Sequence, residues 1–172
     1  MKNLWIIGIG LFLVGCAKKQ EPLISSGVTI PASFIEVQLI GYLGSQIGHW
    51  SLTSDSTYAT VGHDWLPGFY ERFRRDLHRK GVVGWEQGFD CNKFAAAFSA
   101  AAQMEYYRDM WGKPNAAQAL AIGEVWYAQD IGGNHAVVLA ITERGAFFIE
   151  PQTGAFITLS LSERRNILLK KF

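Results

Sequence analysis

The sequence predicts an α+β domain in which helices in its N-terminal part pack on an antiparallel sheet. Two observations support this prediction. Apolar residues recur at helical spacing in the segments 64–80 and 91–107, whereas the segment 122–172 contains short apolar runs separated by turn residues. Removal of the first fifteen residues of the 172 leaves about 157, which is enough for one domain with its own core.

The first residues have the features of an export signal. One positive charge on Met1-Lys2 precedes an apolar run from Leu4 to Val14, which is too short for a comfortable transmembrane helix. The run ends in Leu13-Val14-Gly15-Cys16, which resembles the lipobox of bacterial lipoproteins. The alternative is an uncleaved signal anchor with a chance cysteine.

The lipobox resemblance implies a domain organisation and a location. It implies a signal peptide at 1–15, a tether at 16–30 lipidated on Cys16 (palmitate among the acyl chains), and a folded domain at 31–172. Because Ala17 rather than Asp follows the cysteine, the resemblance implies an outer-membrane lipoprotein that faces the periplasm. We expect the membrane to be a partner through the lipid, and the domain to be a monomer.

Composition argues against a nucleic-acid binder. The whole chain has 16 basic and 15 acidic residues. The predicted signal peptide at 1–15 contains one lysine and no acidic residue. The mature chain, at 15 against 15, is formally neutral and lacks the net positive charge of most nucleic-acid binders.

Cys91 is the cysteine that lipidation would leave free. Asp90 is a suitable N-cap residue and places Cys91 in the first turn of the helix predicted from 91 to about 107. The unpaired N–H groups and the helix dipole there favour a thiolate, which is a nucleophile. A free thiol in an exported protein therefore calls for a functional hypothesis.

The helix predicted at 64–80 has two different faces. Phe69, Phe73 and Leu77 form its apolar side. The rest carries a cluster of cations: Arg72, Arg74, Arg75, Arg79 and Lys80. We interpret this cluster as a solvated face, with contact to anionic lipid headgroups as the functional alternative.

The remaining segments give weaker or shorter signals. Residues 29–49 suggest an edge strand or a short helix, 51–62 is Ser/Thr-rich and suggests a loop, and 115–120 suggests a short helix. Strands are predicted at 122–128, 135–142, 146–150, 155–161 and 166–172.

His135 is the candidate base for Cys91, because it begins a buried strand directly after a turn. Glu150 follows on the next strand and shares its face with Gln152, so either side chain can orient the imidazole. Gln87, four residues before Cys91, is a candidate oxyanion donor. The alternative for each is structural: a histidine at a strand end, a surface glutamate and a loop glutamine.

Three short motifs resemble the papain-like superfamily, which includes cell-wall endopeptidases and transglutaminase-like proteases. The motifs are Asp-Cys-Asn-Lys-Phe-Ala, Gly-Asn-His-Ala-Val-Val and Phe-Ile-Glu-Pro-Gln-Thr-Gly. The resemblance covers about residues 84–160. It implies a papain-like fold with Cys91 as nucleophile, His135 as base and Glu150 or Gln152 as orienting residue. Asn92-Lys93 departs from the Ser-Gly pair of the cell-wall enzymes.

Two functions are therefore expected, in order. The first is a membrane-tethered thiol hydrolase (a cysteine peptidase or amidase) that cleaves peptidoglycan stem peptides or a protein through a Cys-His-Glu triad. The second is a catalytically silent binding lipoprotein of the same fold that occludes a surface receptor or acts in phage exclusion. No cofactor is expected, and the four histidines show no metal-ligand spacing.

Overall fold

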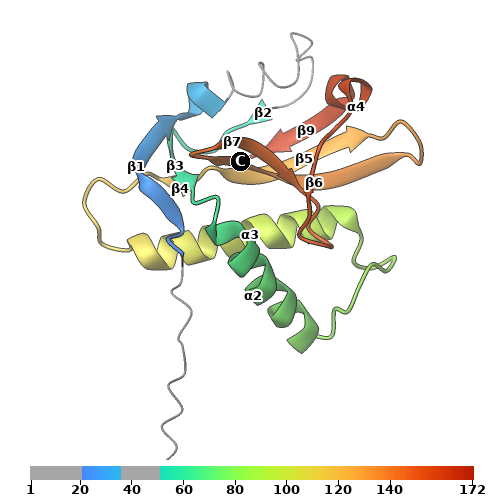
Figure 1. Ribbon diagram of the computed structural model, residues 1–172, viewed down its shortest axis with the longest axis horizontal. Helices are drawn as coiled ribbons and strands as arrows, with labels where there is room; N and C mark the ends of the chain where they lie inside the picture. The colour runs from blue at the N-terminus through green and yellow to red at the C-terminus, as the bar shows by residue number, and fades with distance from the viewer. Residues whose placement is uncertain (1–20, 36–50) are drawn as a thin grey trace, which may run out of the picture.

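The structure is a computed structural model that describes residues 21–35 and 51–172 (Figure 1). The predicted signal peptide and the lipidation residue Cys16 lie outside these residues. The strands are β1 (Ile24–Pro31), β2 (Ser51–Leu52), β3 (Thr57–Val61), β4 (Ala119–Leu120), β5 (Ile122–Ala128), β6 (Asn134–Thr142), β7 (Gly145–Ile149), β8 (Phe156–Ile157) and β9 (Ile167–Lys171). The helices are α2 (Trp65–Arg79), α3 (Cys91–Met110) and α4 (Leu161–Arg165).

The strands form one mixed sheet. Neighbouring strands follow the order β1-β3-β6-β5-β9-β2. In addition, β7 pairs with both β6 and β8. The pairs β2–β9, β3–β4 and β3–β6 are parallel, and the others are antiparallel. The longest regular pairing joins β5 to β6, from Ile122 opposite Ala140 to Ala128 opposite Asn134.

Two helices cover one side of the sheet. Figure 1 shows α3 lying along the sheet and α2 diverging from it at an angle. The core between helices and sheet contains Phe69, Phe94 and Phe98 from the helices and Ala136 and Val138 from β6. A second apolar cluster fills the opposite side of the sheet.

Side-chain alternation along β6 separates the two cores. Ala136 and Val138 belong to the helix-side core, whereas Val137 and Leu139 belong to the second cluster. Successive residues of a strand point to opposite faces, so a strand buried on both sides has a nearly continuous apolar sequence. The sequence from Ala136 to Ile141 has this pattern.

The helix α3 forms because its sequence is rich in alanine and places Phe94, Phe98 and Ala102 on one buried face. Asp90 is extended, as expected for an N-cap, but its side chain makes no capping hydrogen bond. Its carboxylate instead accepts from Lys93 Nζ at 3.1 Å. The helix therefore begins at Cys91 as predicted, without the predicted cap.

The predicted fold class is wrong. The first element of the described chain is a strand rather than a helix, and the sheet is mixed rather than antiparallel. The strand β1 lies largely within the segment 16–30 that was expected to be a tether. This part of the segment belongs to the folded domain, because it pairs with β3. The expected loop at 51–62 holds β2 and β3, and the expected helix at 115–120 ends in β4. In the described ranges no helix is long and apolar enough to span a bilayer.

The side chain of Gln103 joins α3 to the sheet through two hydrogen bonds to Leu120 of β4. Its Nε2 donates to the Leu120 carbonyl at 2.8 Å, and its Oε1 accepts from the Leu120 N–H at 2.9 Å. We expect Gln103→Ala to lower the free energy of unfolding by about 1–3 kcal/mol, because buried backbone groups lose their partner. Urea denaturation measures this. The exposed Gln87→Ala is the control, and equal stability of the two variants would contradict the assignment.

Candidate functional site

The sheet brings His135 and Glu150 into direct contact. His135 is the second residue of β6, and Glu150 directly follows β7, the neighbouring strand. The imidazole Nε2 lies 2.7 Å from Glu150 Oε2, and each side chain is 17% exposed. The sequence predicts that Glu150 or Gln152 meets His135, and the residue in contact is Glu150.

A tight turn fixes the position of Glu150. Its backbone N–H donates to the Ala155 carbonyl at 2.9 Å, and its Oε1 accepts from the Gln152 N–H at 3.1 Å. Gln152 therefore acts through its backbone, since its carbonyl also accepts from the Tyr70 hydroxyl at 2.9 Å. Gly154 closes the turn with φ +76°. The carboxylate thus contacts His135 of β6 and the turn, and the turn itself is held by Tyr70 of α2.

Cys91 lies half-buried in the first turn of α3 and is a free thiol. It packs against the helix-side core. The alternation of β6 places His135 on the same side as Val137 and Leu139, which is the side away from α3. Among the hydrogen bonds of the described residues, none joins the thiol to His135.

Tyr127 lies directly beside His135. It lies opposite His135 in the β5–β6 pairing, and the two rings meet edge to face at 5.8 Å. Burial raises the pKa of Tyr127 to about 12, and negative charge on Glu163, Glu150 and Cys91 adds to the increase. The Tyr127 phenol is therefore buried beside His135, where the charges of Glu150 and Cys91 act on it.

The predicted oxyanion donor Gln87 lies apart from this group. It is exposed in the turn that the backbone pair Glu86–Phe89 closes, ahead of α3. Over the described ranges no cluster of three or more His, Cys, Asp or Glu side chains is suited to a metal ion.

Sequence reasoning missed Tyr127 and Tyr70. The signal for Tyr127 was available, because the turn at 129–133 sets the register that places it opposite His135. Tyr70 had no such signal, since its contact with the Gln152 carbonyl depends on how α2 packs against a distant turn.

Comparisons with known proteins identify the fold but no family. No family model and no curated protein match the sequence. A solved structure titled "PSL1a-E64 complex" matches with a TM-score of 0.64 and 18% identity, over 84% of this chain and 51% of that one. A Polyporus squamosus lectin bound to Neu5Acα2-6Galβ1-4GlcNAc matches with a TM-score of 0.61 and 18% identity, over 84% of this chain and 49% of that one. This chain spans about half the length of each.

These matches contradict the family that the short motifs suggested. The two named structures that share the fold are complexes of PSL1a and of a lectin. The predicted papain-like, cysteine-protease and hydrolase assignments are therefore wrong. The predicted cleavage of an amide bond by a Cys-His-Glu triad is wrong for the same reason. The structure agrees in one respect, since no hydrogen bond of the described residues joins the Cys91 thiol to His135. What the fold shares with the lectin is its architecture, since the identity is low and the match covers half of that chain.

A substitution at Gly154 tests the importance of the turn that holds Glu150. A Cβ at this position would come within 2.5 Å of the Tyr70 ring, in addition to the strain of a positive φ. We expect Gly154→Ala to lower the free energy of unfolding by about 1–3 kcal/mol more than the control Gly133→Ala. Gly133 also has a positive φ (+97°) but nothing within 4 Å of the added Cβ. Equal losses in urea denaturation would show that contact with Tyr70 is unimportant.

Tyr127 gives the site a pH-dependent stability. The phenol has a pKa near 10 when unfolded and about 12 when folded. Between these values the folded state keeps the proton and the unfolded state loses it, so stability that is fully present below pH 10 falls as the pH rises toward about 12. We expect Tyr127→Phe to reduce this fall, measured as the free energy of unfolding against pH. An identical pH profile for the variant would exclude Tyr127 as its source.

Proposed function

We propose that the protein is a ligand-binding protein whose ligand contacts the His135–Glu150 pair. The observation that carries the proposal is the 2.7 Å contact between two ionisable side chains that are each only 17% exposed. Burying such a pair contributes little to stability, because desolvation offsets the attraction. A fixed and partly accessible imidazole is better explained by a role in binding.

The hydrogen bond to Glu150 defines what the imidazole can offer a ligand. Because a carboxylate only accepts, Nε2 carries the proton in this contact. In a neutral ring Nδ1 is then an acceptor, and no hydrogen bond within the described residues occupies it. The matching ligand group is a hydroxyl or an amide N–H. Sugars and peptides both provide such groups, so both ligand classes fit this part of the proposal.

The titles of the two similar structures supply one test compound each. The lectin is bound to a sialylated trisaccharide and PSL1a to E64. These ligands belong to those proteins, and in this chain they serve as test compounds. Cys91 is half-buried and is the further group that we propose for contact with the ligand.

Anchoring is a separate part of the proposal. We propose that Cys16 carries lipid and holds the domain at a bacterial membrane, because the charged start, apolar run and lipobox occur in that order. Labelling with a radioactive or clickable fatty acid in cells tests it. The Cys16→Ser variant should lose the label and leave the membrane fraction.

Calorimetric titration of the full chain with the trisaccharide and with E64 tests the ligand site. We expect His135→Ala and Glu150→Gln to weaken binding about two- to tenfold, since a hydrogen bond between neutral groups contributes about 0.5–1.5 kcal/mol. His78→Ala and Glu86→Gln are the matched controls, because both residues are exposed and lie outside the pair.

Three outcomes decide the proposal. Equal affinities of the site variants and the controls would refute the placement of the ligand. If neither the trisaccharide nor E64 binds, the ligands of the two similar structures no longer support the proposal. Mass spectrometry of the intact complex reports whether a bound compound is attached to Cys91, and product release from a peptide would contradict a purely binding role.

A further inference from the structure

A groove runs between the two long helices, away from the His135–Glu150 pair. It has a volume of about 700 Å³. Its floor is formed by Phe69, Phe73 and Leu77 of α2 and by Ala97 and Ala101 of α3. Figure 1 shows the two helices diverging on the side of α3 away from the sheet. The groove therefore has an apolar floor and lies on the helical side of the domain.

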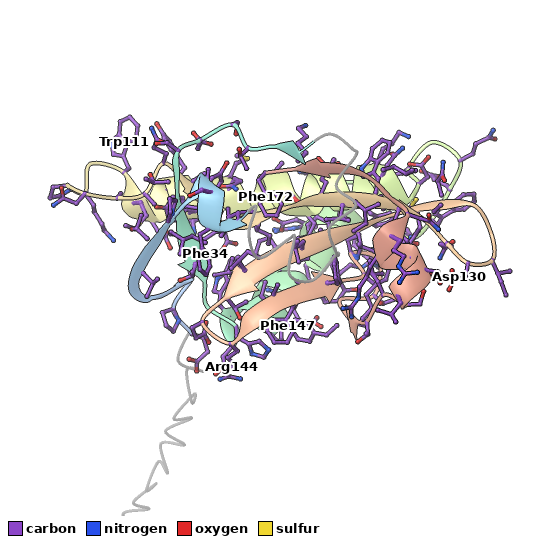
Figure 2. All side chains as sticks on the ribbon, turned by 90° about the horizontal axis from the view of Figure 1, so that it is seen from above. Phe34, Trp111, Asp130, Arg144, Phe147 and Phe172 are labelled. Carbon is purple, nitrogen blue, oxygen red and sulfur yellow. The ribbon has the colours of Figure 1, made fainter. Side chains whose placement is uncertain are left out.

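Large apolar side chains stand exposed along the α3 side of this groove. Met104, Tyr107 and Trp111 are 73%, 60% and 72% exposed, and all three line it. The centroids of the Tyr107 and Trp111 rings lie 5.0 Å apart, so the rings form one aromatic pair. Figure 2 shows Trp111 projecting from one end of the molecule, with Asp130 of the β5–β6 turn at the other. An exposed apolar cluster of this kind marks an interaction surface.

Cations border the apolar cluster. Lys80 and Arg108 line the groove, and Arg74, Arg75 and Arg79 line a second hollow of about 640 Å³ on the adjoining flank of α2. Some of the charge is neutralised within the protein, since Arg72 pairs with Glu105 at 2.9 Å, Arg79 pairs with Asp76 and Arg108 pairs with Asp109.

The remaining charge is positive. Neither Arg75 nor Lys80 forms an ion pair with any residue of the described chain. From Trp65 to Lys80 the segment holds five Lys or Arg residues against the two acids Glu71 and Asp76. The surface therefore combines apolar side chains with an excess of basic ones.

We propose that this helical surface docks on an anionic phospholipid bilayer. Tryptophan and tyrosine favour the boundary between headgroups and acyl chains, where Trp111 and Tyr107 would insert beside Met104. Lys80 and Arg75 would contact lipid phosphates, each contributing through attraction to the negative surface. The combination of exposed aromatic rings and excess cations fits a charged membrane better than a neutral protein surface.

The start of the domain lies on the same side. Leu23 packs in the helix-side core with Trp65, and its carbonyl accepts from the Gly62 N–H at 2.8 Å. The described chain therefore enters the domain on the helical side of the sheet. This surface is independent of the ligand site, so the two proposals stand or fall separately.

Vesicle co-sedimentation of the full chain tests the proposal, with phosphatidylcholine alone and with added phosphatidylglycerol. We expect tighter binding to the anionic vesicles. The aromatic variant carries Tyr107→Ala together with Trp111→Ala, and the charge variant carries Arg75→Glu together with Lys80→Glu. Each variant should lower the affinity for anionic vesicles by about tenfold or more.

The controls use exposed residues away from the groove. Ile131→Ala removes a side chain that is 90% exposed in the β5–β6 turn, and Arg165→Glu reverses an exposed charge on α4. Both should bind as the wild type does. A loss of affinity in the controls equal to that in the groove variants would overturn the proposal, because it would indicate unspecific attraction.

Hydrogen exchange separates this surface from the N-terminal apolar run, which is common to all variants. Anionic vesicles should slow exchange of the backbone amides at 104–111. Vesicle binding without protection there would overturn the proposal, and so would equal binding to neutral and anionic vesicles.

Discussion

The antiparallel pairing of β5 with β6 is the constraint on which the rest of the structure depends. Seven residue pairs, from Ile122–Ala140 to Ala128–Asn134, hold the two strands in one register. This register decides which side chains of β6 face the helices and which face the second core. It also places Tyr127 opposite His135. A slip of one residue would exchange both sets at once, because side chains alternate along a strand.

Local patterns predicted the long elements well and the arrangement of the sheet poorly. The helices α2 and α3 and the strands β5, β6 and β9 lie close to where periodicity and turn residues placed them. The short strands β2, β3 and β4 were missed. Their two to five residues carry too little pattern, and their parallel pairing depends on distant parts of the chain.

The candidate site shows the same limit. The contact between His135 and Glu150 was predictable, because a tight hairpin joins their strands and leaves few choices of partner. The relation of Cys91 to His135 was not predictable. It depends on which face of β6 the helix α3 covers, and a motif in the sequence does not contain that information. Three short motifs therefore suggested a family whose geometry this chain was then expected to share.

The turn between β5 and β6 gives experimental access to the site. Gly132 and Gly133 both adopt positive φ values, and Ile131 beside them is almost fully exposed. The turn lies a few residues from His135, and Gln129 closes it with a backbone hydrogen bond to the Gly133 carbonyl at 2.8 Å. An environment-sensitive fluorophore attached at position 131 would therefore report occupancy of the neighbouring polar groups while leaving both apolar cores undisturbed.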